Sequence, residues 1–345
     1  MNSFANGRLR NLRELHGLSQ TEFAARLGLS QAALSHIESG RRPVPDTVIA
    51  STAHTFSVAP SFFVVEPVEY TSTDLNYRTK KLSARERRMA NTAFGLTEQI
   101  LRSAPRVKSS AELHPTASPA DSRRPVTEIE HLAATAREQI GIAQDKVINN
   151  VVRCIERTGV LVTGIALPPG AGRIDGISTP KRSDDSFVMT LDLDKPGDRI
   201  RFSAAHELGH LLLHTVSRPT SDAIRESEAD TFASAFLLPR AAILRELSPD
   251  LTLNGYAQIK ARWGVSIQAI VRRARDLHVI TDDRYRSLHI QLSSRGWRTS
   301  EPVDIPRETP AIPTPDLTGA AQTTSPAAPT GSSGSNVVSL FGNRA

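Results

Sequence analysis

The spacing of apolar and polar residues divides the chain into stretches of different periodicity. Residues 6 to about 64 contain short segments of helical apolar spacing, separated by turn signals. Residues 70–103 predict one connecting helix, charged on one side and apolar on the other. From Pro125 to about Glu301 the pattern is helical, then strand-like in VLVTGIAL and SFVMTLDL, then helical again. We therefore expect a mainly α fold with a small sheet, an α+β arrangement.

Two stretches lack this periodicity. Residues near 104–124 are rich in Pro, Ser and Ala, which predicts a linker. Beyond Pro302 the chain has almost nothing to bury, so we expect it to be disordered. The predicted parts are a first domain, a connecting helix with its linker, a second domain and a disordered tail, at residues 1–68, 69–124, 125–302 and 303–345.

Composition argues against a disulfide-bonded, secreted or membrane protein but says little else about its class. The single cysteine, Cys154, excludes an internal disulfide, and no apolar run approaches the roughly 20 residues of a membrane helix. Residues 1–13 are polar and basic, without the apolar core of a signal peptide. These features predict a cytoplasmic protein with no membrane partner. The net charge of +6 suits a nucleic-acid partner but is weak support by itself.

Capping and turn residues predict a pair of short helices near the N-terminus. Ser19 and Glu22 have the spacing of a capping box, and Gly28 can end the helix that they open. Ser30 can cap a second helix, which runs to Glu38. Two helices joined by a turn of about three residues form a helix-turn-helix.

The segment LRELHGLSQTEFAARLGLSQAALSHIESGRRPVP resembles the Xre/Cro-type repressor family across residues 7–64. The resemblance implies a five-helix domain that places its second motif helix in the major groove of double-stranded operator DNA as a two-fold dimer. It places one set of side chains at base edges: Gln31, Ala32, Ala33, Ser35 and His36. It places another set on phosphates: Gln20, Arg41 and Arg42. A small helical bundle used for protein pairing is the alternative.

The segment HELGH predicts a metal site on a helix. His206 and His210 are four residues apart and lie about 40° apart around a helix, close enough to bind one ion. Glu207 can act as general base on water activated by zinc. The alternative is a buried helix whose histidines bond to backbone groups. Because that helix has almost no polar face, its buried His and Glu need a partner, and a metal serves all three.

A second predicted helix, in RESEADTFASAFLLPR, supplies candidates for a third ligand. Glu226 lies in line with the apolar stripe of this helix, so a carboxylate there needs a cation, and we choose it as the ligand. Glu228 lies about 200° away, which predicts a solvated surface acid. Asp230 is placed either to accept a ring N–H from a liganding histidine or to serve as an acid near the helix N-terminus.

Two other reactive side chains have simpler interpretations. His214 is one turn beyond His210, and three histidines along one straight helix span too far for one ion. We expect it to support the ligands or to pack. Cys154 lies in an apolar-periodic helix, where a small buried residue is the expected role rather than a nucleophile.

Several ordered motifs between Val126 and Pro302 resemble the ImmA/IrrE family of zinc metallopeptidases. They include DGISTPKRSDDSFVMTLDLDKPGDRIRFSAAHELGHLLLH, ESEADTFASAFLLPR, VSIQAIVRRARDLHVIT and RGWRTSEP. The resemblance implies a zincin-like α/β domain and zinc, about one ion per chain, on His206, His210 and Glu226, with Glu207 catalytic. It also implies that SFVMTLDL lies along the cleft, where it could pair with an extended substrate.

The expected function is regulated proteolysis by a DNA-binding protein. The family's usual substrate is a transcriptional repressor, so the resemblance implies a repressor or antitoxin-like partner, or this chain's own helix-turn-helix domain. The alternative is a transcriptional regulator that binds DNA through residues 7–64 and uses the zinc domain for sensing or dimerisation without catalysis. The cleaved bond, the operator, the activating signal and the oligomeric state do not follow from the sequence.

Overall fold

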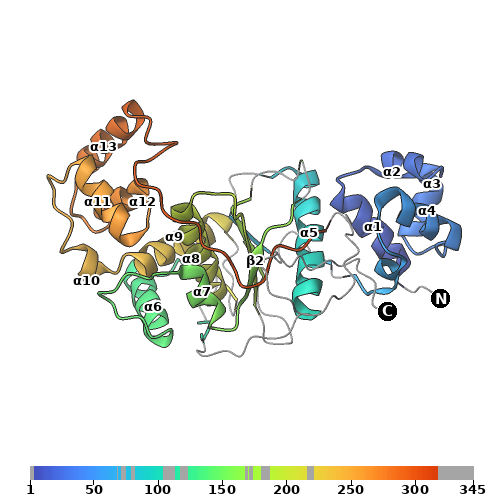
Figure 1. Cartoon of the computed structure of the whole chain (residues 1–345), viewed down its shortest axis with the longest axis horizontal. Helices are drawn as coiled ribbons and strands as arrows, with labels where there is room; N and C mark the ends of the chain where they lie inside the picture. The colour runs from blue at the N-terminus through green and yellow to red at the C-terminus, as the bar shows by residue number, and fades with distance from the viewer. Residues whose placement is uncertain are drawn as a thin grey trace, which may run out of the picture.

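The computed structural model describes residues 4–67, 69–70, 75–78, 82–103, 113–116, 123–167, 170, 174–179, 187–215 and 221–317. These residues form a mainly helical molecule with one four-stranded sheet, which confirms the predicted fold class (Figure 1). No helix among them is long and apolar enough to cross a membrane.

Five helical segments form the N-terminal domain: α1 (Ala5–Leu15), α2 (Gln20–Arg26), α3 (Gln31–Glu38), α4 (Asp46–Phe56) and the 3₁₀ helix η1 (Pro60–Val64). The predicted capping box is present, because Ser19 Oγ accepts a hydrogen bond from the Glu22 amide and the Glu22 carboxylate accepts from the Ser19 amide. Ser30 Oγ caps α3 by accepting from the Ala33 amide. Leucines and phenylalanines from all these segments share one core.

The connecting helix is α5 (Ala84–Ser103), and it has two apolar faces rather than the one predicted. The prediction of a single helix over residues 70–103 is also wrong for its first part, where Asn76–Arg78 form a strand. Leu96 and Ile100 pack in the core of the N-terminal domain. Phe94 and Leu101 pack instead against Ile177 of the sheet. Figure 1 shows α5, in cyan, between the N-terminal helices and the strands. The helix therefore joins two cores and is not a free connector.

The sheet has the strand order β1-β3-β4-β2 and consists of β1 (Asn76–Arg78), β2 (Leu161–Gly164), β3 (Gly176–Ser178) and β4 (Val188–Leu191). β2 pairs with β4 in parallel, whereas β3 is antiparallel to both β4 and β1. Because β4 is paired on both edges, the expectation that SFVMTLDL could accept a substrate strand is wrong. A strand with both edges paired has no backbone groups left for an added peptide.

The second domain surrounds the other face of the sheet with helices. They are α6 (Val126–Gln139), α7 (Val151–Glu156), α8 (Gly197–Leu213), α9 (Asp222–Leu237), α10 (Arg240–Ile243), α11 (Leu253–Trp263), α12 (Ile267–Asp276) and α13 (Asp282–Ser294). Met189 and Leu191 of β4 pack in one core with Ala204 and Leu208 of α8. The sheet is thus sandwiched between α5 and α8, and α5 belongs to the structure of the second domain as much as to the linker.

The segment 303–317 corrects the predicted start of a disordered tail. Glu308 is buried, accepts a hydrogen bond from the Val152 amide at 2.9 Å and forms an ion pair with Arg201. The segment continues across β2, where Thr163 Oγ1 donates to the carbonyl oxygens of Ile312 and Pro313. Residues 318–345 lie outside the described residues, as does most of the predicted linker at 104–124.

Candidate functional site

Helix α8 is buried along nearly its whole length, as its apolar composition predicts. His206 and His210 lie on the same face, one turn apart, with 3.1 Å between their Nε2 atoms. Both side chains are almost completely buried. The motif thus places two ring nitrogens side by side within the core.

Helix α9 brings a carboxylate to these nitrogens. Gly209 of α8 allows the approach, because a Cβ atom there would lie 3.2 Å from Phe232 Cβ and 3.3 Å from Ala229 Cα on α9. The Glu226 carboxylate lies 3.4 Å from His206 Nε2 and 3.3 Å from His210 Nε2. The three ligand atoms lie within 4.8 Å of one another. These are the three residues that the sequence predicts as metal ligands.

The second nitrogen of each ring has its own partner. Asp230 Oδ1 lies 2.9 Å from His206 Nδ1, and His214 Nδ1 lies 2.9 Å from His210 Nδ1. His214 Nε2 in turn lies 3.1 Å from a carboxylate oxygen of Glu228. Asp230 and His214 therefore lie where the sequence predicted supporting residues.

Glu228 corrects the prediction of a solvated surface acid. Its side chain is fully buried, and it accepts hydrogen bonds from His214 and from the Arg124 amide, the latter at 2.7 Å. Because the Glu228 carboxylate only accepts, His214 donates from Nε2 and its Nδ1 becomes an acceptor. His210 must then donate from Nδ1 and keep its Nε2 lone pair for the space beside Glu226.

The electrostatics of the cluster favour ligands in their metal-binding forms. Burial lowers the pKa of His210 to about 3, so the ring is neutral at neutral pH. Burial opposes ionisation of Glu226, but the pKa of its carboxyl, which lies beside the His206 and His210 rings, is held well below the ordinary value. Neutral imidazoles and an ionised carboxylate are the forms that bind a divalent cation.

Glu207 is fully buried and faces strand β3. Its Oε2 accepts a hydrogen bond from Ser178 Oγ at 2.5 Å. A Cβ atom at Gly176 would lie 2.9 Å from Glu207 Oε1, so the carboxylate needs a glycine above it. Gly176 and Ser178 were not predicted as site residues, although both lie in the short GIST stretch that precedes strand β4.

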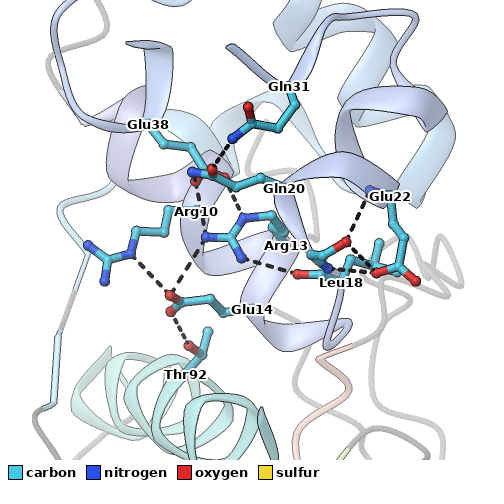
Figure 2. Close-up of polar contacts among 10 residues, drawn as sticks. Arg10, Arg13, Glu14, Leu18, Gln20, Glu22, Gln31, Glu38 and Thr92 are labelled. Carbon is cyan, nitrogen blue, oxygen red and sulfur yellow. Dashed lines mark hydrogen bonds and ion pairs between the residues drawn. The ribbon is translucent and has the colours of Figure 1, made fainter. Parts of the chain in front are cut away.

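The predicted DNA-contact residues gather on α2, α3 and the turn after α3. Gln31, Ala32, His36, Arg41 and Arg42 are exposed, and Gln20, Ala33 and Ser35 are half-buried. Figure 2 shows the polar chain behind them: Gln31 Nε2 donates to Gln20 Oε1, and Gln20 Nε2 donates to Glu38 Oε2. Arg13 holds Glu38 with two further hydrogen bonds. The two glutamines are therefore fixed relative to each other.

Comparison with known proteins agrees with this geometry in both halves of the chain. Residues 9–63 match the family model of a helix-turn-helix, and residues 155–275 match that of an IrrE N-terminal-like domain. The chain is a helix-turn-helix domain fused to an IrrE-like domain. The IrrE-like match spans both histidines, Glu207 and Glu226, and indicates a metallopeptidase-like domain. No curated protein matches the chain.

Proposed function

We propose that this chain is a DNA-binding regulator whose IrrE-like domain is a zinc-dependent endopeptidase. The observation that carries the proposal is the convergence of two Nε2 atoms and one carboxylate, with the Nδ1 atoms of both rings already engaged. Two imidazoles and one carboxylate form the donor set of catalytic zinc sites that keep one position open. Zinc therefore fits these residues, with about one ion per chain.

The chain's own residues supply the rest of the chemistry. When bound, zinc would provide Lewis acidity for the scissile carbonyl and for the attacking water. Glu207 would accept a proton from that water and deliver it to the departing amide nitrogen as the peptide bond breaks. Ser178 would orient the Glu207 carboxylate through its hydroxyl, and Asp230 and His214 would hold the two ligand rings in place.

The partners follow from the fusion of the two domains. The base-edge residues would be Gln31, Ala32, Ala33, Ser35 and His36 of α3. Arg41, Arg42 and Gln20 would contact phosphates. The substrate would be a transcriptional repressor or an antitoxin-like regulator, which shares the cytoplasm and the DNA with this protein. A two-fold dimer on a symmetric operator is part of the proposal.

A second candidate is a regulator in which the metal domain senses or dimerises without catalysis. Helix α5 favours it, because one face packs on the helix-turn-helix core and the other on the sheet beside the candidate site. A change in the second domain therefore has a direct structural route to the DNA-binding domain.

The substitution Glu207→Gln separates the two candidates, because it removes the base but none of the ligands. We expect this variant to retain about one zinc per chain and to lose proteolysis by about 10²–10⁴-fold. The measurement compares newly formed N-termini in cells that produce the wild type or Glu207→Gln, alongside the metal content of each purified protein. Identical sets of N-termini and identical regulatory output, with zinc bound in both, would favour the sensing function.

A further inference from the structure

Strand β3 is the part of the sheet that touches the candidate site. Gly176 and Ser178 both contact the Glu207 carboxylate, and β3 is antiparallel to its neighbours on each side. An extended peptide that reaches Glu207 by adding to the sheet needs backbone partners on β3. One edge of β3 belongs to β4, so the other edge is the position for such a peptide.

That edge is filled by β1. Asn76, Tyr77 and Arg78 pair in antiparallel register with Ser178, Ile177 and Gly176. Asn76 is buried on the Glu207 side of the sheet, and its Nδ2 lies 3.5 Å from Ser178 Oγ. The chain's own backbone thus follows the path that an extended peptide beside Glu207 would take.

β1 comes from outside the IrrE-like domain. It lies between the two family matches, at 9–63 and 155–275, and it is held from the other side by α5. The Tyr77 hydroxyl donates to Asn91 Oδ1, and the Arg87 guanidinium lies 5.5 Å from the centre of the Tyr77 ring. The occupant of the edge is therefore attached to the helix that contacts the DNA-binding domain.

We propose that β1 is a built-in pseudosubstrate, which occupies the peptide-binding edge of β3 until a substrate strand displaces it. That a substrate displaces β1 rests on the proposed function. That β1 occupies the edge rests on the strand pairing alone. The pattern of β1 also predicts the preferred peptide: a small polar residue facing Ser178 and Glu207, followed by an aromatic residue facing α5. A regulator segment in extended conformation with that pattern is the class of substrate expected.

Two variants change the occupancy of the edge in opposite directions. Tyr77→Pro removes the ring that fastens β1 to α5 and restricts φ in the middle of the strand, so it opens the edge. The double variant Tyr77→Cys with Ile177→Cys closes it, because residues directly opposite each other in antiparallel strands have Cα atoms about 4.5–5.5 Å apart, as a disulfide requires. These positions lie on the α5 side of the sheet, away from Glu207, and the bond can be reversed by a phosphine reductant.

Two fluorescent peptides serve as probes, and both contain Leu-Asn-Tyr-Arg, the sequence of residues 75–78. One ends in a hydroxamate, which can chelate a metal, and the other ends in an amide, which cannot. Affinity is measured by fluorescence anisotropy on full-length proteins whose zinc content and melting temperature are known. An occupied edge lowers the apparent affinity by the fraction of open molecules, so we expect the amide to bind the oxidised double variant about tenfold or more weaker than the reduced one. Tyr77→Pro should bind it about tenfold tighter than the wild type.

Equal affinity in the oxidised and reduced forms, or no binding to any of the proteins, would overturn the pseudosubstrate. Weaker binding to Tyr77→Pro, at an unchanged melting temperature, would overturn it too and would mean that peptides pair with the outer edge of β1. The hydroxamate separates this result from the proposed function. If the proteins hold no zinc, the hydroxamate gains nothing over the amide and the peptidase proposal fails, while the amide still decides the occupancy of the edge.

Discussion

A chain of hydrogen bonds sets the protonation of the metal-facing histidine. The Arg124 amide and His214 both donate to Glu228, which leaves His214 Nδ1 to accept from His210. His206 reaches the same state by a shorter route, through Asp230. The partners of the two Nδ1 atoms therefore favour the tautomers whose Nε2 lone pairs a metal would take.

Removing the carboxylate beside His206 should weaken the metal site without abolishing it. Asp230→Asn removes the charge that fixes the ring, so we expect zinc affinity to fall by about 10–100-fold. Asp222→Asn on the same helix is the matched control, because the Asp222 side chain is 83% exposed and pairs with Arg225 one turn away. Competition with a chromogenic chelator measures both. Equal zinc affinities in Asp230→Asn and the control would refute the supporting role of Asp230.

For single residues, the sequence predicts those site positions that follow from the geometry of one helix. It does not predict the burial of a residue that depends on contacts between several elements. The spacing of His206 and His210 places both on one face, and the apolar stripe of α9 selects Glu226. The same angular argument fails for Glu228, because a helical wheel gives the direction of a side chain but not which other elements pack against it. The backbone of Arg124 and the ring of His214 come from other elements and bury that carboxylate.

The segment 303–317 is held by a buried charge in addition to apolar contacts, since Leu317 lies in the core of the N-terminal domain and Ile312 packs against the sheet. Glu308 accepts from the first turn of α7 and pairs with Arg201 of α8, and both side chains are about 95% buried. Arg201 also donates to the carbonyl oxygens of Ile148 and Gly264. This segment therefore ties α7 and α8 together next to the sheet.

Breaking this pair should destabilise the second domain. Glu308→Ala leaves the Arg201 guanidinium buried without its counter-charge, which costs about 3–5 kcal/mol in the free energy of unfolding. Asp304→Asn, at an exposed position of the same segment, is the control and should change stability by less than about 0.5 kcal/mol. Urea unfolding of the two variants beside the wild type makes the comparison. Similar midpoints for both variants would show that the segment does not stabilise the fold.

Element prediction succeeds for the amphipathic helices and fails where burial has no periodic pattern. Repeated apolar spacing predicts α5, α8 and α9 because each must cover a core. The three residues of β1 are too few to show an alternation, and their partner strand lies about a hundred positions away in the sequence. The sequence does not predict that residues 303–317 pack on the fold, because Glu308, which is buried there, is a charged residue.

At the scale of the whole molecule, α5 contacts both the helix-turn-helix domain and the sheet beside the candidate site. Thr92 of α5 donates to Glu14 of α1 (Figure 2). Leu96 of the same helix packs in the N-terminal core. On the other face of α5, Phe94 packs in one core with Tyr77 of β1 and Ile177 of β3. A movement of α5 would therefore affect both the helix-turn-helix and the strand that covers Glu207. No sequence pattern indicates this, since the two faces of α5 belong to different cores.

The N-terminal domain should bind duplex DNA with a salt dependence set by its phosphate contacts. The substitutions Arg41→Ala and Arg42→Ala remove two exposed cations next to α3, so we expect weaker binding on every duplex tested. The slope of log affinity against log salt should fall by about one for each lost phosphate contact. Arg286→Ala on α13, also exposed, is the control. An unchanged slope in the double variant would remove these residues from the DNA interface.

The most direct test of the account is the zinc content of the full-length protein, wild type beside Glu226→Ala and Asp222→Asn. The account predicts about one zinc per chain in the wild type and in Asp222→Asn, and a large loss in Glu226→Ala, because His206 and His210 alone leave the ion without its carboxylate. Zinc retained at full occupancy in Glu226→Ala, or no zinc in the wild type after it is supplied, would contradict it.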